Sequence, residues 1–301
     1  MKAFILSDIH VDAWFETAVD RKRLKGLNPG EGVVPETMDW LWKFRNYPVT
    51  DALIVAGDIA NDYQSYVQTV EWLSKKYKKV YICVGNHDIL VRHATPYVSN
   101  AKFALSEDKL DAILMQDLKY DNVHIIEGRQ VDGIAGCMGM CDLKCDAMPG
   151  FDYRTAWRRS WFDGRNWRYM NQEPGKIWNY YDAMLTGLCK AAPKIVMTHF
   201  APFQVGVNWK YRNNSGNVFF YYQGEKYLDL LPDGTTWVCG HIHDQKICDW
   251  VNSSGAHIRI LCNPSGYPGE GQFEADTVKV VNGKIERGVV TTTHEDFIID
   301  I

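Results

Sequence analysis

Short apolar runs alternate with amphipathic segments through the first third of the chain. Residues 3–6, 52–56 and 80–84 are uninterrupted apolar runs, which predict strands that are buried on both faces. Between them, apolar residues recur at helical spacing in residues 37–44 and 66–76. Strands that alternate with helices predict an α/β fold, with a sheet that helices cover on both faces.

The rest of the chain predicts more strands than helices. Strands are expected at residues 123–126, 131–137, 194–198, 237–239, 258–261 and 278–281. Helices are expected at 171–190 and 217–231, and residues 138–170 show no regular pattern. No repeat or linker divides the chain, so we expect a single domain over 1–301 with an Arg- and Trp-rich insertion around 138–192.

Composition narrows the class of protein. Of the 301 residues, 46% are hydrophobic and 23% are charged, which is typical of globular proteins and excludes a disordered chain. The net charge of −4 gives no bulk attraction to nucleic acid or anionic lipid. No apolar run approaches the length of a membrane span, and residues 1–8 lack a secretory signal. We therefore expect a cytoplasmic protein without a membrane partner; the sequence gives no signal for oligomeric state.

The cysteines favour buried thiols over a metal site. Of eight cysteines, Cys83, Cys239 and Cys262 lie inside apolar strand-like runs. Cys137, Cys141 and Cys145 recur every four residues, but they lack the short Cys-x2-Cys spacing of zinc knuckles and a matching second pair. We interpret all of these as free thiols.

Five predicted strands end in residue types that bind metal ions. In chain order these residues are Asp8 and His10, Asp58, Asn86, His199, and His241 and His243. Sites in α/β sheets form outside the carboxyl ends of the strands, so neighbouring strands would bring these side chains together. Gly57, Gly85 and Gly240 precede three of the groups and would allow a sharp exit from the strand and close backbone approach.

The donor types favour a two-metal site. Carboxylate, imidazole and amide oxygen suit Mn, Fe or Zn, whereas a thiolate cage or an all-oxygen Ca²⁺ site would need other residues. One aspartate bridges two cations when its two oxygens point to different neighbours. Two divalent ions carry more charge than two aspartates return, and the excess favours an anionic group such as phosphate. Two ions roughly 3.5–4 Å apart clamp the entering and leaving oxygens of a displacement.

The ordered motifs Asp-x-His, Gly-Asp, Gly-Asn-His-Asp, His and Gly-His-x-His resemble those of the calcineurin-like metallophosphoesterase family. They run from Asp8 to His243 and so cover most of the chain. Each motif alone is weak, but all five in order, each at the end of a strand, are specific. The resemblance implies a four-layer αββα sandwich of two mixed sheets flanked by helices.

The resemblance also implies a ligand set for two divalent ions per chain. Manganese is the ion we expect first, with Fe, Zn, Ni or Co as alternatives. Asp58 would bridge the two ions. The remaining ligands would be Asp8, His10 and His243 for one ion and Asn86, His199 and His241 for the other.

The resemblance assigns two catalytic residues. His87 would lie beside the phosphate and protonate the leaving oxygen, and Asp88 would orient His87 through a hydrogen bond. A metal-bridging hydroxide would attack phosphorus in line. Asn61, three residues after Asp58, either faces the phosphate or caps the following helix, and capping is the prediction we favour.

The substrate class depends on the insertion. Residues 151–169 carry five arginines against two aspartates, interleaved with aromatic residues. This surface suits phosphate and a base ring, so we expect a phosphodiester of nucleotide or nucleic-acid type, contacted by Asn86, His87, Arg158 and Arg159. The alternative, to which we give equal weight, is that the segment packs Trp157 and Trp161 inward and leaves its arginines at the surface.

Two rival functions remain open. One is a phosphomonoesterase, including a protein phosphatase, although Asp88 stands where such phosphatases usually carry Glu and Val11 replaces the Gly of their Asp-x-His-Gly motif. The other is a non-catalytic scaffold on the same fold, which would be expected to have lost ligands. Here all the ligands and His87 are present.

Overall fold

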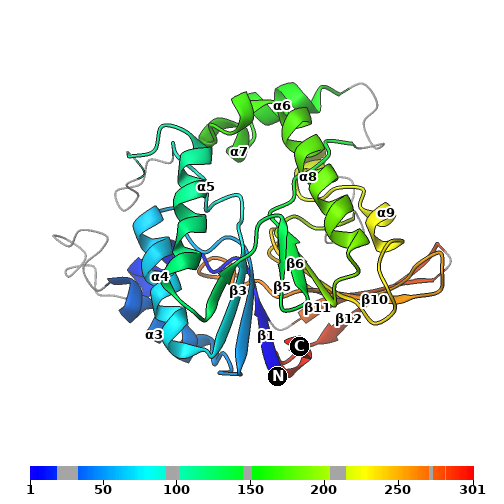
Figure 1. The fold of residues 1–301 in the computed structure, drawn as a ribbon, viewed down its shortest axis with the longest axis horizontal. Coiled ribbons are helices and arrows are strands. Elements are labelled where there is room, and N and C mark those ends of the chain that lie inside the picture. The colour runs from blue at the N-terminus through cyan, green and yellow to red at the C-terminus, as the bar shows by residue number, and fades with distance from the viewer. Residues whose placement is uncertain are drawn as a thin grey trace.

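Two β-sheets form the centre of the protein, and helices cover their outer sides (Figure 1). The computed structural model describes residues 1–18, 33–92, 100, 102–144, 151–203, 215–270, 274–281 and 283–301. This arrangement of two mixed sheets flanked by helices confirms the predicted fold class.

The first sheet has five strands in the order β13-β1-β2-β3-β4. Four of them run parallel, and β13 pairs with β1 antiparallel. Their bounds are Lys2–Leu6 for β1, Ala52–Ala56 for β2, Lys79–Cys83 for β3, Val123–Ile125 for β4 and Ile298–Asp300 for β13. All residues of β2 are buried, as its uninterrupted apolar sequence predicts.

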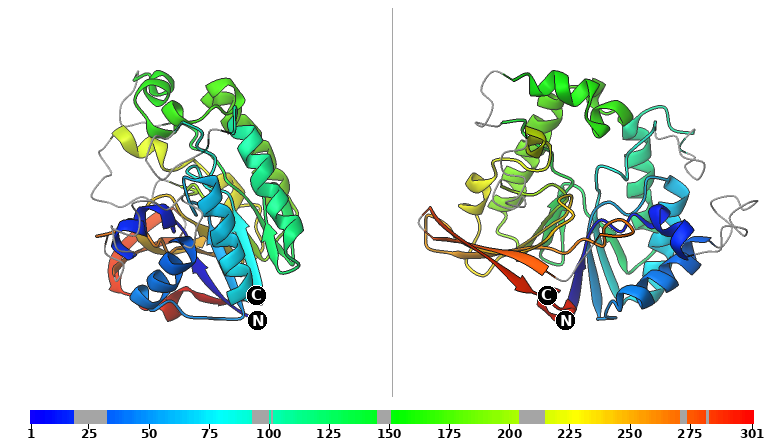
Figure 2. Two further views of the ribbon diagram at one scale, coloured as in Figure 1. Left: turned by 90° about the vertical axis from the view of Figure 1, so that its left-hand side faces the viewer. Right: turned by 180° about the vertical axis from the view of Figure 1, so that it is seen from behind.

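The second sheet has eight strands in the order β12-β11-β9-β10-β8-β7-β6-β5. From one edge to the other these are Lys284–Thr291 (β12), Glu274–Val281 (β11), Gln245–Val251 (β9), His257–Cys262 (β10), Thr236–Cys239 (β8), Ile195–Thr198 (β7), Ile134–Cys137 (β6) and Arg129–Val131 (β5). Strands β6, β7 and β8 are parallel neighbours. The hairpin of β11 and β12 projects from one end of this sheet (Figure 2).

Helices cover both sheets from outside. The first sheet carries α3 (Val33–Arg45), α4 (Tyr63–Lys76) and α5 (Ser106–Leu114), and the second carries α8 (Pro174–Lys190) (Figure 1). The short helices are α1 (Phe15–Ala18), α6 (Tyr153–Arg159), α7 (Phe162–Asn166) and α9 (Glu225–Leu228). Single 3-10 turns occupy Val11–Trp14, Met115–Lys119, Met170–Gln172, Ser215–Phe219 and His294–Phe297.

The helices of the insertion join the two halves of the molecule. Figures 1 and 2 show α6 and α7 lying across the top, between α5 and α8. Trp157 of α6 and Trp167 after α7 are fully buried, and their rings pack edge to face with centroids 5.8 Å apart. The inward packing of tryptophans expected for this segment is therefore confirmed for Trp157, while Trp161 is only partly buried.

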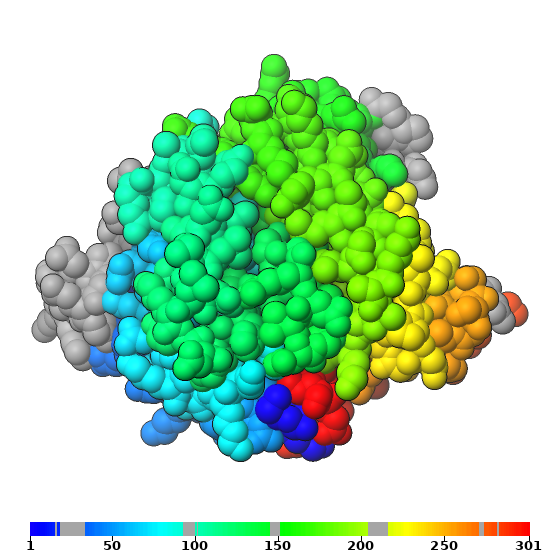
Figure 3. Space-filling view, viewed as in Figure 1, coloured from blue at the N-terminus to red at the C-terminus, as the bar shows by residue number. Residues whose placement is uncertain are grey.

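The chain begins and ends at one place. The first and last residues lie side by side at the edge of the molecule (Figure 3), where the terminal amino group of Met1 donates to the carbonyl oxygen of Ile301 over 3.2 Å. The antiparallel pairing of β1 with β13 holds this arrangement. Among the helices of the described residues, none combines the length and apolar character that crossing a membrane requires.

Some predicted elements differ in the structure. Residues 131–137 form a hairpin rather than one strand, because Asp132 and Gly133 adopt left-handed backbone conformations and turn the chain. The continuous helix predicted for 217–231 is wrong: only a 3-10 turn and the short α9 form, since the bridge between Ala201 and Tyr221 interrupts the segment. Residues 138–170, expected to be irregular, contain α6 and α7.

The cysteines agree with the prediction of free thiols. Cys83, Cys239 and Cys262 are buried and unpaired, as are Cys137 and Cys141. Burial raises the pKa of Cys137 and Cys141 well above its usual range, so neither is a ready thiolate ligand. Cys145 lies outside the described residues.

Candidate metal centre

The carboxyl ends of strands from both sheets meet at one buried place. Asp8 and His10 follow β1, Asp58 follows β2, Asn86 follows β3, His199 follows β7, and His241 and His243 follow β8. Six of these seven side chains are buried, and His243 is partly exposed. The structure therefore brings together all seven of the predicted ligands.

The first group of ligand atoms consists of Asp8, His10 and His243. The Nε2 atoms of His10 and His243 lie 3.1 Å apart, and Nε2 of His243 lies 3.4 Å from Oδ1 of Asp8. Three donor atoms of these types that converge at this spacing match a site for a divalent cation.

The second group consists of Asn86, His199 and His241. Nε2 of His199 lies 2.7 Å from Oδ1 of Asn86 and 3.2 Å from Oδ2 of Asp58. His241 also has a ring nitrogen within 4.8 Å of the ligand atoms of His199 and Asp58. This donor set, with imidazole, amide and carboxylate, suits the same class of cations as the first group.

Asp58 belongs to both groups through one oxygen. Its Oδ2 faces His199 at 3.2 Å and His10 at 3.7 Å, and no hydrogen bond satisfies this buried atom. Its Oδ1 accepts a hydrogen bond from the backbone amide of His87 over 2.8 Å. Oδ2 of Asp58 therefore faces both ligand groups, whereas Oδ1 is held by the loop that carries His87.

Three of the four histidines are held by their second ring nitrogen. Nδ1 of His199 donates to the carbonyl oxygen of Ala56 over 2.8 Å, and Nε2 of His241 lies 3.2 Å from the carbonyl oxygen of Phe219. Nδ1 of His243 lies 2.9 Å from Oε2 of Glu270. Such partners fix the ring orientation and leave the other nitrogen for a metal ion.

The residues of the centre fit two divalent cations. A metal site requires free ligand atoms that are held in position. Oδ2 of Asp58 is buried without a hydrogen bond, and outer partners orient the imidazoles. Glu270 and Phe219 had no signal in the sequence, because they lie far from the motifs along the chain.

The electrostatics keep both aspartates ionised. Burial raises the pKa of Asp8, but the adjacent His243 outweighs burial and lowers it to about 2. Burial also opposes ionisation of Asp58, yet His199 and His87 hold its pKa well below the usual range. In return Asp58 and Asp8 overcome the effect of burial on His199 and raise its pKa to about 9. Ionised carboxylates are the form that binds cations.

The backbone at the strand ends is strained. Most of the ligand residues adopt the left-handed conformation, which non-glycine residues rarely use: Asp8 (φ 52°), His10 (φ 43°), Asp58 (φ 57°), His241 (φ 69°) and His243 (φ 49°). Gly85 lies so close to Asp58 that a Cβ atom there would be 2.1 Å from Oδ1 of Asp58. The lack of a side chain at Gly85 thus allows the two loops to approach each other closely.

His87 is oriented by a residue other than the one predicted. Its Nδ1 lies 2.6 Å from the side-chain oxygen of Asn61. The predicted hydrogen bond between His87 and Asp88 is wrong, because both carboxylate oxygens of Asp88 accept from backbone amides instead. Asn61 also does not cap the next helix: Asp62 does so, accepting from the amide of Ser65 over 3.0 Å.

Asp88 instead ties together the two loops that carry Asp58 and Asn86. Its carboxylate accepts hydrogen bonds from backbone amides of residues 58, 59, 60 and 85, at 2.8–3.1 Å. Burial and the charge of Asp58 raise the pKa of Asp88 to about 7. The role of Asp88 is therefore to shape the loops around the ligands.

The insertion reaches the centre through α7. The ring of Phe162 stacks on His87 with centroids 4.9 Å apart and an angle of 19°. Oδ1 of the buried Asp163 accepts from Nδ2 of Asn86 over 2.7 Å, and the indole of Trp167 donates to the carbonyl oxygen of Asn86 over 2.9 Å. Nothing in the sequence indicated these contacts, because α7 is short and carries no motif.

Aromatic rings line the remaining sides. Tyr267 stacks on His10 with centroids 4.4 Å apart, and Phe200 packs on His241 at 4.3 Å. Trp161 of the insertion stacks on Phe219 at 4.3 Å, next to the carbonyl that holds His241. Polar ligands surrounded by apolar rings are poorly hydrated, which strengthens electrostatic interactions inside the centre.

Of the two arginines predicted to contact substrate, Arg158 is paired within the insertion and Arg159 is exposed at the surface. Arg158 forms an ion pair with Glu173 and donates from Nε to the carbonyl oxygen of Gln172 over 3.1 Å. Arg159 is exposed at the last position of α6. Substrate contact by Arg158 and Arg159 stays a prediction.

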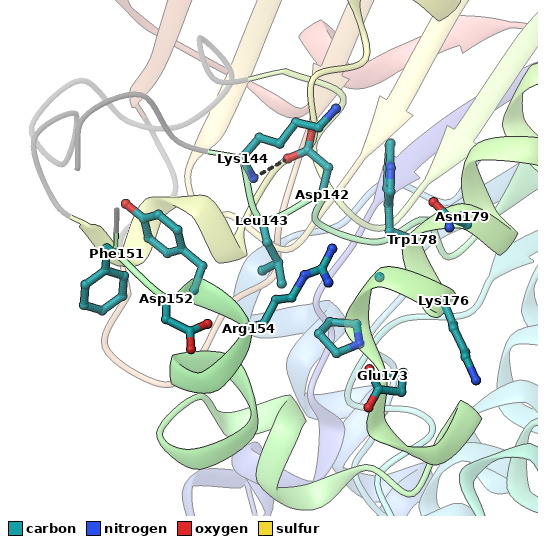
Figure 4. A pocket seen from close by; sticks show the side chains of 13 residues that line it. Asp142, Leu143, Lys144, Phe151, Asp152, Arg154, Glu173, Lys176, Trp178 and Asn179 are labelled. Carbon is teal, nitrogen blue, oxygen red and sulfur yellow. Dashed lines mark hydrogen bonds between the residues drawn. The ribbon is translucent and has the colours of Figure 1, made fainter. Parts of the chain in front are cut away.

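A separate pocket of about 670 Å³ lies where α6, the start of α8 and residues 142–144 meet. In Figure 4, the Arg154 side chain extends from α6 toward Trp178 of α8. Acidic and basic side chains line the pocket in equal number: Asp142, Asp152 and Glu173 against Lys144, Arg154 and Lys176. Their charges balance, so the lining does not select a ligand of one sign.

Comparison with known proteins agrees with this geometry. The model of the calcineurin-like phosphoesterase family matches residues 1–245, a range that includes all seven ligand residues. The fold and the centre define a metal-dependent phosphoesterase, and the chain belongs to the calcineurin-like phosphoesterase family. Members of this family depend on a dinuclear metal centre, and the two groups described above are the candidate ligands of that centre in this chain.

One solved structure of similar fold is a phosphopantetheinyl hydrolase from Mycobacterium tuberculosis. The two chains are 15% identical, the match covers 89% of this chain and 90% of that one, and the TM-score is 0.58. No curated protein matches the chain in sequence. At this identity the structural neighbour shows the shared fold.

Proposed function

We propose that this chain is a phosphodiesterase acting on a nucleotide or nucleic-acid type of substrate in the cytoplasm. The observation that carries the proposal is the convergence of both ligand groups on Oδ2 of Asp58, with His87 beside it. Asp8, His10 and His243 would hold one divalent ion, and Asn86, His199 and His241 the other. Manganese is the ion we propose first.

The bound ions would supply a water of lowered pKa and a positive charge that offsets the charge of phosphate. Asp8 and Asp58 would offset only part of the charge of two divalent ions, and the excess would favour an anionic substrate. The aromatic rings of Tyr267 and Phe162 exclude water from two sides.

His87 would act on the leaving oxygen. The amide oxygen of Asn61 accepts hydrogen bonds only, so the proton of the neutral imidazole resides on Nδ1 and Nε2 is left free. Burial lowers the pKa of His87 to about 4, and a phosphate next to the ring favours the protonated form. Nε2 would then donate its proton to the leaving oxygen.

Hydrolysis of two synthetic esters tests the proposal. Metal-stripped protein is resupplied singly with Mn, Zn, Fe, Ni, Co or Mg and given bis-p-nitrophenyl phosphate or p-nitrophenyl phosphate, with His87→Ala in parallel. We expect metal-dependent turnover of the diester that falls about 10²-fold or more in His87→Ala. Turnover of the monoester alone would replace the diesterase with a phosphomonoesterase. Two bound ions without any turnover would favour the scaffold.

A further inference from the structure

The side chain of Asn86 is held at both ends. Its Oδ1 faces Nε2 of His199 over 2.7 Å, on the side of the second ligand group. Its Nδ2 donates to Oδ1 of Asp163 over 2.7 Å, on the side of α7. The amide plane therefore lies between the metal centre and the insertion.

This orientation needs a directional partner. The oxygen and nitrogen ends of an asparagine amide have nearly the same shape, so packing alone does not choose between them. The unprotonated oxygen of a carboxyl group only accepts hydrogen bonds and so selects the NH2 end. Asp163 thereby places the NH2 group toward α7 and leaves the oxygen, the end that binds a cation, toward His199.

The position of Asp163 is itself fixed by packing. Asp163 is buried, and the next residue, Gly164, lies so close to α6 that a Cβ atom there would be 2.0 Å from the carbonyl oxygen of Trp157. On the other side, Trp167 donates to the backbone of Asn86 over 2.9 Å. The helix and the metal-binding loop are thus joined through both the backbone and the side chain of Asn86.

We infer that Asp163 is a positioning residue that presents the Asn86 amide as an oxygen ligand, so that the insertion completes the second metal site. The inference rests on the proposed role of Asn86 as a ligand. Deletion of residues 151–169 would have different effects in the two cases. A lid that only selects substrates would leave turnover of small esters intact, whereas loss of Asp163 would remove the support of one ligand.

Two substitutions separate the hydrogen bond from the packing. Asp163→Asn keeps a carbonyl oxygen that accepts from Asn86, while Asp163→Leu keeps a similar volume and removes the acceptor. Asp152→Asn is the matched control, because Asp152 is an aspartate of the same insertion whose side chain accepts from the amide of Thr155 at the start of α6. Metal content and affinity are measured with Mn²⁺ alone, by equilibrium dialysis and elemental analysis, in the full chain.

We expect Asp163→Leu to weaken one of the two Mn²⁺ sites by about ten- to a hundredfold and to leave the other unchanged. Asp163→Asn should retain most of the Mn²⁺ affinity that Asp163→Leu loses, and Asp152→Asn should bind both ions like the wild type. Equal affinity of both sites in wild type and Asp163→Leu would overturn the inference. If Asp163→Leu does not fold, Asp163→Ala replaces it under the same criteria.

A double-mutant cycle distinguishes positioning from a general structural effect. In an Asn86→Ala background, Asp163→Leu should cause no further loss of Mn²⁺ affinity, because the ligand it presents is absent. Additive losses would contradict positioning. Binding of two ions without ester hydrolysis would remove the proposed function but leave the inference standing. Hydrolysis by a wild type whose Asp163 variants bind Mn²⁺ normally would remove the inference alone.

Discussion

The side-chain oxygen of Asn61 lies 2.6 Å from Nδ1 of His87. A neutral amide therefore orients this histidine, where a carboxylate was expected. The amide fixes the ring and its tautomer without the charge that would strongly raise its basicity.

Replacement of Asn61 should affect turnover and not metal content. Asn61→Ala frees the His87 ring, and we expect the kcat for bis-p-nitrophenyl phosphate to fall about tenfold or more. Asn61→Asp keeps an acceptor and adds a charge, so it should recover activity and shift the His87-dependent limb of the pH–rate profile upward. An unchanged kcat in Asn61→Ala would contradict the role of Asn61.

Glu270 should support the first metal site. Its carboxylate lies 2.9 Å from Nδ1 of His243, and this contact fixes the orientation of the His243 ring. Glu270→Gln should weaken that Mn²⁺ site by about ten- to a hundredfold. Glu274→Gln, an exposed glutamate of β11, is the control and should bind Mn²⁺ like the wild type. Equal affinities in the two variants would exclude the supporting role.

The glycine before Asn86 should not tolerate a side chain. In Gly85→Ala the new methyl group would lie 2.1 Å from Oδ1 of Asp58, so the loops must separate and both ligand groups lose Asp58. We expect loss of Mn²⁺ binding and a lower Tm. Gly187→Ala in α8 is the control, because nothing lies within 4 Å of its Cβ position; it should stabilise the fold by roughly 0.5–1 kcal/mol. Normal Mn²⁺ binding by Gly85→Ala would show that the close approach is unimportant.

The stability of the fold should decrease with rising pH because of Glu127. This buried carboxyl accepts from the amide of Met138 over 2.9 Å, and burial raises its pKa from 4.5 to about 8. The folded state holds its proton while the unfolded state releases it, so the contribution of Glu127 is full below pH 4.5 and is lost as the pH rises to about 8.

Thermal unfolding of metal-stripped protein between pH 5 and 8 measures this effect. Glu127→Gln remains neutral, so its Tm should fall less over this range than that of the wild type. Parallel Tm curves for the two proteins would show that Glu127 does not change its protonation on unfolding.

The sequence predicted the framework of the centre well. Strands such as Ala52–Ala56 are uninterrupted apolar runs, and parallel strands bring their carboxyl ends together, so the ligands after them had to converge. The side-chain partners were harder to predict. Asp88 follows His87 directly, yet neighbouring residues in a tight loop point in different directions, and its carboxylate meets backbone amides.

The contribution of the insertion could not be predicted. Helix α7 has only five residues, too few for a periodic pattern, and Asp163 has no motif around it. Asp163 lies far from Asn86 along the chain, and tertiary packing of Trp157 and Trp167 brings the two residues together. The left-handed backbone at Asp8 and Asp58 likewise arises from the packed structure, since local preference opposes it.

The number of metal ions bound per chain tests the central claim most directly. Elemental analysis of protein dialysed against Mn²⁺ should find two ions per chain in the wild type and fewer than one in Asp58→Asn, because Oδ2 of Asp58 faces both ligand groups. Asp249→Asn, on β9, is the control and should retain two ions. Two ions in Asp58→Asn, or none in the wild type with Mn²⁺ or any of the alternative metals, would contradict a dinuclear centre at these residues.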